Sequence, residues 1–125
     1  MNLTDAVVVG AAGAIGAGSR FALDAAIRAR ARTTFPVGTL AVNLSGSLVL
    51  GFLAGLVLFH AASSRLTLIG GTGFCGGYTT FSTASYETVR LGADGEGGAA
   101  VLNAGASALG TLGAAALGLT LAYFT

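Results

Sequence analysis

LTLIGGTGFCGGYTTFSTASY, residues 66–86, is the stretch that decides the fold of this chain. It contains no charged residue and is as long as the roughly 20 residues that a helix needs to cross a hydrocarbon core about 30 Å thick. Five glycines lie between residues 70 and 77, and Thr79 and Thr80 follow them. Glycine weakens a helix, and unwound backbone at membrane depth survives only where protein buries it or it lines a wet cavity. We predict a span broken near mid-membrane, in preference to an intact glycine-rich helix.

Three other stretches are equally poor in charge. Residues 37–59 and 97–125 carry no charged side chain, and 6–23 carries only Arg20. Only 9% of the residues are charged, against about 25% in soluble domains. We predict an all-α integral membrane protein with one domain, residues 1–125, and both termini on the same side. Its four transmembrane helices are expected at about 5–27, 37–60, 66–91 and 98–123.

Glycine is abundant, at 21 of 125 residues. Helices in lipid associate through close backbone contact, which small side chains permit. The pairs Gly51/Gly55 and Gly73/Gly77 have the four-residue spacing of such contacts. Four helices so rich in small residues enclose little volume, so we also expect an oligomer.

Several classes of function are disfavoured. The net charge of +1 does not indicate a nucleic-acid partner, because such proteins usually carry a clustered basic footprint. The basic residues 28, 30 and 32 are better explained as a loop beside the membrane. Cys75 is the only cysteine, which excludes an internal disulfide and a site built from several cysteines.

Polar side chains inside the apolar spans indicate a pathway. Hydroxyl and amide groups without an acidic residue suit an anion or a neutral solute better than a proton or a metal cation. Phe81 lies among them and has a ring edge of positive character. Arg20 could lower the energy of an anion in a vestibule, or extend to the membrane surface. A stripe that only packs helices together is the other interpretation. The pathway candidates are Thr39, Asn43, Ser82, Thr83, Asn103, Ser107 and Thr111.

Three motifs carry a resemblance to a known family. The chain resembles the CrcB/Fluc fluoride channels in these motifs, which are GAGSRF at 16–21, GTLAVNLSGS at 38–47 and GFCGGYTTFST at 73–83, with Glu87 shortly after. The resemblance implies an antiparallel dual-topology dimer with two narrow fluoride pathways. It also implies passive, non-enzymatic export of fluoride from the cytoplasm across the plasma (inner) membrane of a bacterium.

The resemblance also implies roles for individual residues. Asn43 corresponds to a pore-lining amide and Phe81 to an aromatic ring that the ion passes edge-on. Ser107 and Thr111 fall on a polar track, with Asn103 at its outer end. The backbone carbonyls of Gly76 and Thr79, from both subunits, would hold a central structural Na⁺, and Arg20 and Glu87 would lie towards the aqueous ends, in the vestibules.

Two features depart from the family pattern. Ala84 occupies the place where many members have a second Phe. Arginines 28, 30, 32 and 90 are expected on one side of the membrane and Arg65 on the other, which by the positive-inside rule favours a single orientation. A subunit of a heterodimer would explain both departures, although a homodimer is the first expectation.

Two rival functions belong to other classes. A small proton-coupled multidrug exporter requires a carboxylate deep in its first span, whereas Asp5 and Asp24 lie at the ends of this one. A non-conducting membrane scaffold would need the glycine contacts and not the polar stripe.

Overall fold

The computed structural model describes all 125 residues, and every regular element in it is helical. Three helices are long and apolar enough to cross a membrane, which confirms the prediction of an all-helical membrane protein at this level. The segment between the second and third of them is divided into short pieces. The long helices are α1 (Leu3–Arg30), α2 (Val37–His60) and α6 (Gly97–Tyr123), and the short pieces are α3 (Ser64–Leu66), the π-helix η1 (Thr67–Cys75), α4 (Gly76–Tyr78) and α5 (Phe81–Ala93).

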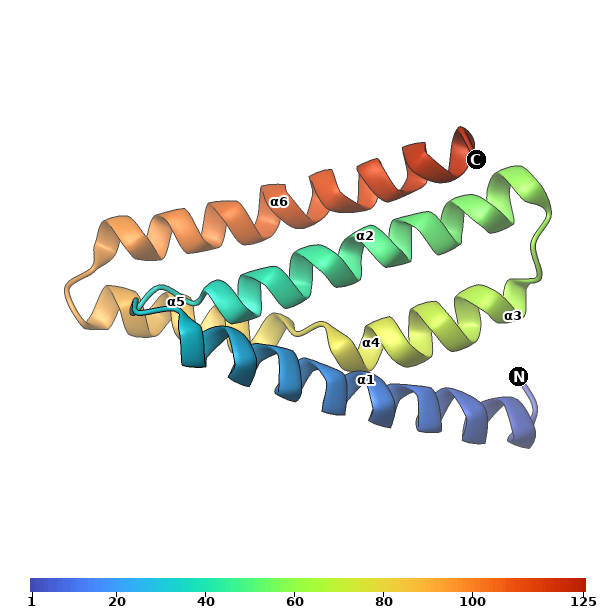
Figure 1. The fold of residues 1–125 in the computed structure, drawn as a ribbon, viewed down its shortest axis with the longest axis horizontal. Helices are drawn as coiled ribbons and strands as arrows, with labels where there is room; N and C mark the ends of the chain where they lie inside the picture. Colours follow the sequence, from blue (N-terminus) through green and yellow to red (C-terminus); the bar gives the residue numbers. More distant parts are fainter.

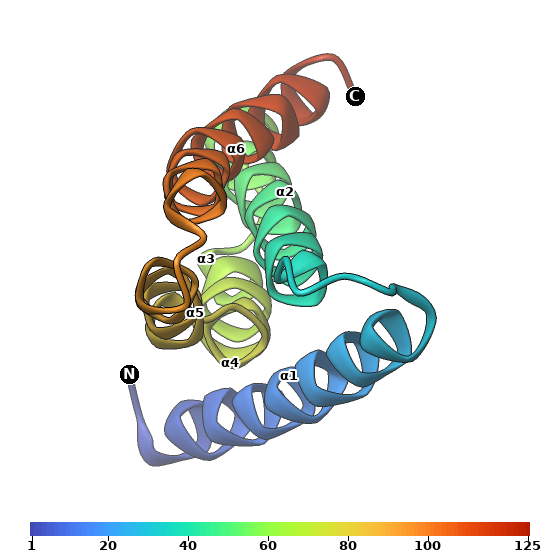
Figure 2. The same ribbon diagram turned by 90° about the vertical axis from the view of Figure 1, so that its left-hand side faces the viewer.

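The helices run up and down the long axis of the molecule (Figure 1). The chain enters and leaves at the same end, where the joint between α2 and α3 also lies, and the other two joints lie at the opposite end. In the end-on view of Figure 2, α1 and α6 lie on opposite sides of the central helices. The principal contacts are between α2 and α6, and between α1 and the η1–α4 pieces.

The interruption lies after the glycine run and not within it. Residues 67–75 form a wide helix in which the Gly76 N–H donates to the Gly71 carbonyl, five residues earlier. The backbone is extended at Thr79 (φ −83°, ψ 161°) and at Thr80 (φ −149°, ψ 125°). The Thr83 N–H then donates to the Thr80 hydroxyl at 3.2 Å, so that Thr80 caps α5. The glycines therefore widen the helix, and the two threonines end it.

The predicted glycine spacings lie at helix contacts. A Cβ on Gly77 would overlap the backbone of Gly13 on α1, and a Cβ on Gly51 would overlap the backbone of Ala115 on α6. Backbones can approach this closely only without side chains between them. These glycines therefore let the helices pack closely.

The molecule has a thin core. Only 18 of 125 residues are buried, and large apolar side chains such as Phe21 and Leu109 are exposed along the helices. A soluble monomer rarely exposes so much contiguous apolar surface. This surface fits contact with lipid or with another membrane subunit.

Candidate functional site

The Asn43 side chain hydrogen-bonds to the backbone at the helix break. Its Nδ2 donates to the Thr80 carbonyl at 2.8 Å, and its Oδ1 accepts from the Thr80 N–H at 2.8 Å. Both backbone groups would otherwise lack the partners that an unbroken helix supplies, and leaving them unpaired is costly. Asn43 thus supplies both hydrogen bonds, and because an amide nitrogen has two hydrogens, one of them is not used by Thr80.

A groove of about 610 Å³ begins at this contact and runs between α5 and α6. It brings together four of the predicted pathway residues, Asn43, Phe81, Ser107 and Thr111. No charged residue lines it. Four further polar residues of its wall were not among the predicted site residues, namely Ser47, Thr80, Ser85 and Thr88.

Ser107 lines this groove and carries a hydroxyl without a hydrogen-bond partner. Its Oγ is buried. The neighbouring Thr111 hydroxyl instead donates to the Ser107 carbonyl. Phe81 lies at the groove with 87% of its surface exposed. The groove therefore combines a free donor with an aromatic ring that other parts of the chain leave uncovered.

Asn103 lies behind the wall of the groove and not along it. It is 2% exposed and donates to the Thr88 hydroxyl at 2.8 Å. Thr88 lines the groove and donates in turn to the Ala84 carbonyl at 2.8 Å. A signal for Thr88 was present in the sequence, since Phe81, Ala84 and Thr88 follow the three- and four-residue spacing of one helix face.

A second cavity, of about 190 Å³, lies between α1, α2 and the start of α5. Arg20, Thr39 and Thr83 line it, and so does Thr80, which it shares with the groove. Ser82 lines neither cavity and is exposed, with its hydroxyl 3.4 Å from that of Thr80. Of the two hydroxyls predicted on this turn, Thr83 therefore faces a cavity and Ser82 does not.

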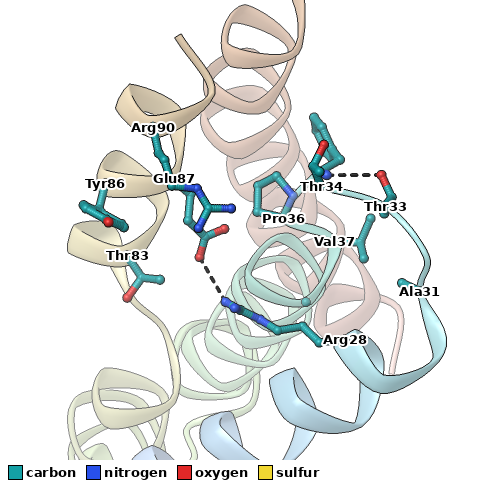
Figure 3. Close-up of a pocket in the computed structure, with 12 residues that line it drawn as sticks. Arg28, Ala31, Thr33, Thr34, Pro36, Val37, Thr83, Tyr86, Glu87 and Arg90 are labelled. Atoms are coloured by element: carbon teal, nitrogen blue, oxygen red, sulfur yellow. Dashed lines mark hydrogen bonds and ion pairs between the residues drawn. The ribbon is translucent and has the colours of Figure 1, made fainter. Parts of the chain in front are cut away.

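A third cavity, of about 420 Å³, lies at the end of the bundle that holds the loop between α1 and α2. Figure 3 shows the Arg28 and Arg90 side chains extending towards Glu87 in this cavity. Glu87 is 6% exposed; its Oε1 accepts from the Thr39 hydroxyl at 2.7 Å and lies 3.4 Å from Arg28 Nη2. The other carboxylate oxygen, Oε2, is buried without a partner.

Arg20 and Glu87, the two predicted vestibule residues, line different cavities. Arg28 pairs with Glu87 and was overlooked, because the basic residues 28, 30 and 32 were all assigned to a loop. Arg28 instead belongs to the last turn of α1 and also binds Asp24, one helical turn earlier, at 3.0 Å. The i, i+4 spacing of Asp24 and Arg28 was the available signal.

Of the two carbonyls considered for a cation, that of Thr79 lies on the break, whereas Gly76 begins α4. The Thr79 carbonyl accepts no hydrogen bond, whereas the Thr79 hydroxyl donates to the Cys75 carbonyl at 2.8 Å. Gly76 is exposed. The chain contains no cluster of three or more His, Cys, Asp or Glu side chains that could hold a metal ion.

Comparison with known proteins gives one family. Residues 7–119 match the family model described as CrcB-like protein, Camphor Resistance (CrcB). The fluoride-specific ion channel FluC 1 of Leifsonia xyli subsp. xyli is 49% identical over 115 residues, which cover 92% of this chain and 84% of that protein. FluC 1 of Streptomyces avermitilis is 47% identical, with 84% and 85% covered, and FluC 2 of Mycolicibacterium paratuberculosis is 50% identical, with 80% of each covered.

Proposed function

We propose, since this chain belongs to the CrcB-like family, that it is one subunit of a fluoride-selective channel. The channel lets fluoride leave the cytoplasm down its own gradient, without ATP and without a chemical reaction. Relatives that are 47–50% identical over most of their length carry the name of fluoride-specific ion channels. We place it in the plasma (inner) membrane of a bacterium, with fluoride and the lipid bilayer as its partners.

The unpaired Ser107 hydroxyl is the observation that carries the proposal. It is a buried donor in a groove without charged residues, and a buried donor without a partner is costly unless something binds it. A small anion would accept from Ser107 and from the free hydrogen of Asn43, and the positive edge of the Phe81 ring would favour the same ion. A cation would find no acidic side chain in this groove.

The proposed route joins the three cavities through residues that they share. Thr83 lines both the end cavity and the second cavity, and Thr80 lines both the second cavity and the groove. Fluoride would enter past Glu87 and Arg28, pass Arg20 and Thr39, and reach Asn43 beside the break. From there it would follow Phe81, Ser107 and Thr111 along the groove.

Fluoride efflux from proteoliposomes tests the function directly. Purified protein in vesicles loaded with fluoride should release it under a potential that is clamped with K⁺ and valinomycin, while vesicles loaded with chloride should release far less. The rivals give other results. A proton-coupled exporter would move organic cations in exchange for protons and no fluoride, and a scaffold would move neither.

Ser107→Ala should lower the initial rate of fluoride efflux about tenfold or more. The substitution removes a donor to a charged ion, and a hydrogen bond of this kind contributes about 1.5–3 kcal/mol. Thr120→Ala is the matched control on the same helix, because the Thr120 hydroxyl is exposed and donates to the Ala116 carbonyl. Equal efflux rates in the two variants would remove Ser107 from the pathway.

We further propose a four-span subunit that works as an antiparallel, dual-topology dimer. The residues from α3 to α5 form the fourth span, broken at Thr79 and Thr80. A partner subunit would cover Phe81, which stands exposed beside the groove.

A homodimer is the first form to test. Arginines 28, 30, 32 and 90 lie at one end of the helices and Arg65 at the other, which would give a fixed orientation by the positive-inside rule and so favours a heterodimer with a paralogue. The numbers 1 and 2 in the names of the relatives agree with that second form. Flux that appears only when a paired homologue is added would identify the heterodimer.

Na⁺ is proposed as a structural cofactor at the centre of this dimer. The carbonyls of Gly76 and Thr79 from both subunits would hold it, and the Thr79 carbonyl has no hydrogen-bond partner within the chain. Neutral oxygens of a broken helix suit a small hard cation. One bound Na⁺ would supply positive charge at the interface without a charged side chain.

Exchange of Na⁺ for N-methyl-D-glucamine at equal ionic strength should lower the temperature at which the dimer is lost. A ligand that binds only the folded dimer stabilises it by about 2.7 kcal/mol at a hundred times its dissociation constant. The melting temperature in detergent, measured across a Na⁺ titration, checks this. A midpoint independent of Na⁺ concentration would contradict the proposed cofactor.

A further inference from the structure

Arg28 is shared by two carboxylates at the end of the bundle. Its Nε lies 3.0 Å from Asp24 on its own helix, and its Nη2 lies 3.4 Å from Glu87 on α5. Arg28 belongs to none of the three family motifs and is half-exposed, with 58% of its side chain accessible. It is therefore an accessible cation bound to a buried anion.

Glu87 stands where two of the cavities meet. The residue lines the end cavity, and its hydrogen-bond partner Thr39 lines the second cavity. Thr83, one turn before Glu87, lines both. An anion that moves between these cavities must pass a carboxylate that has little water around it. Because water screens a buried charge poorly, an uncompensated Glu87 would repel the anion strongly.

The other arginines near Glu87 are placed differently. Arg90 lines the same cavity but forms no ion pair within 4.0 Å with any carboxylate. Arg20 lines the second cavity, where Asp24 is the acidic residue. Arg28 is the arginine that contacts Glu87 itself, and it comes from α1, whose backbone does not approach that of α5 closely.

We propose that Arg28 is a positioning residue that masks the charge of Glu87 and so keeps the entrance of the pathway open to anions. The inference rests on the proposed fluoride pathway and adds a control of its entry. In this arrangement the Thr39 hydroxyl holds one oxygen of Glu87 in place, and the guanidinium of Arg28, which Asp24 shares, offsets part of its charge at the cavity surface. Without Arg28, a fixed negative charge would face each entering fluoride ion.

Arg28→Gln should lower the initial rate of fluoride efflux from proteoliposomes about tenfold, the order of effect that an unscreened unit charge near the route produces. Arg28→Lys keeps the positive charge and should recover most of the rate. Glu87→Gln keeps an oxygen for Thr39, removes the charge, and should raise the rate about twofold. The double variant Arg28→Gln/Glu87→Gln should recover most of the rate of Glu87→Gln, because the Glu87 charge is gone and only Asp24 loses its partner.

Arg30→Gln is the matched control. Arg30 lies two residues after Arg28, is exposed and forms no ion pair. The variant therefore removes one positive charge from the same end of α1 without breaking a contact. The proposal predicts a small change in this variant and a large one in Arg28→Gln. A purely structural role of Arg28 would leave the double variant as slow as Arg28→Gln alone, and that result would overturn the proposal.

The outcomes separate this inference from the function on which it rests. Wild-type flux together with normal flux in Arg28→Gln overturns the masking role alone. Absence of fluoride flux in the wild type overturns both. If Arg28→Gln yields too little protein, Glu87→Gln decides by itself, because a marked loss of flux there would mean that the Glu87 charge assists fluoride and needs no mask.

Discussion

Asn43→Ala is expected to reduce fluoride efflux about a hundredfold or more. The substitution removes a donor from the groove and also leaves the N–H and the carbonyl of Thr80 without partners at the helix break. Each unsatisfied buried group costs about 1–3 kcal/mol, so the break should rearrange and Phe81, the next residue, should move with it. Efflux from proteoliposomes, at equal amounts of reconstituted protein, measures the loss.

Asn2→Ala is the control for this variant. The Asn2 amide also accepts from a backbone N–H, that of Asp5 at 2.8 Å, but it caps α1 at the far end of the molecule. Flux should stay near the wild-type rate there. In Asn43→Asp the acceptor for the Thr80 N–H remains, while the donor is lost and a negative charge is added. If Asn43→Asp folds but conducts no fluoride, the loss of flux belongs to the pathway and not to the fold. Wild-type flux in Asn43→Ala would remove Asn43 from the pathway.

Gly118→Ala should produce the largest loss of folded protein. A Cβ at this position of α6 would overlap the Leu48 carbonyl and lie 2.7 Å from the Phe52 nitrogen, both backbone atoms of α2. Backbone cannot move aside as a flexible side chain can, so α2 and α6 would have to separate. Overpacking of this kind typically costs about 1–3 kcal/mol, a large share of the stability of a small protein.

The matched control lies five residues earlier on the same helix. A Cβ on Gly113 would meet nothing within 4 Å, so Gly113→Ala should leave the yield of monodisperse protein and its melting temperature unchanged or slightly higher. Size-exclusion profiles and thermal unfolding in detergent compare the two variants. Equal melting temperatures for Gly118→Ala and Gly113→Ala would show that α2 and α6 do not pack as closely as described.

The sequence predicts the long helices because an uncharged, apolar run of about 20 residues is typical of a membrane-spanning helix. It also predicts glycine contacts, since small residues four apart fall on one helix face. The position of the break was harder to predict. Glycine is a poor helix former, yet residues 67–75 remain helical as a wide turn, and the chain becomes extended only at Thr79 and Thr80. Packing of the glycines against α1 outweighs their weak intrinsic preference.

For the site too, one part was predictable from the sequence and another was not. The polar types were visible along the chain, and four of them meet in the groove. Their partners were not visible, because Asn43 bonds to a residue 37 positions away and Arg28 to one 59 positions away. Local spacing carries no information about such pairs. The same is true of the Asn103 amide, which donates to Thr88, 15 positions earlier.

Both ends of the chain lie at one end of the bundle (Figure 1), and this restricts how two copies can be joined in a single polypeptide. A short linker would hold the copies in the same orientation. Two subunits that face opposite ways would need a connection that crosses the bilayer, about 20 apolar residues in helical form. A tandem gene fusion that conducts fluoride with such a helix and fails with a flexible loop would report the relative orientation of the subunits without a structure of the pair.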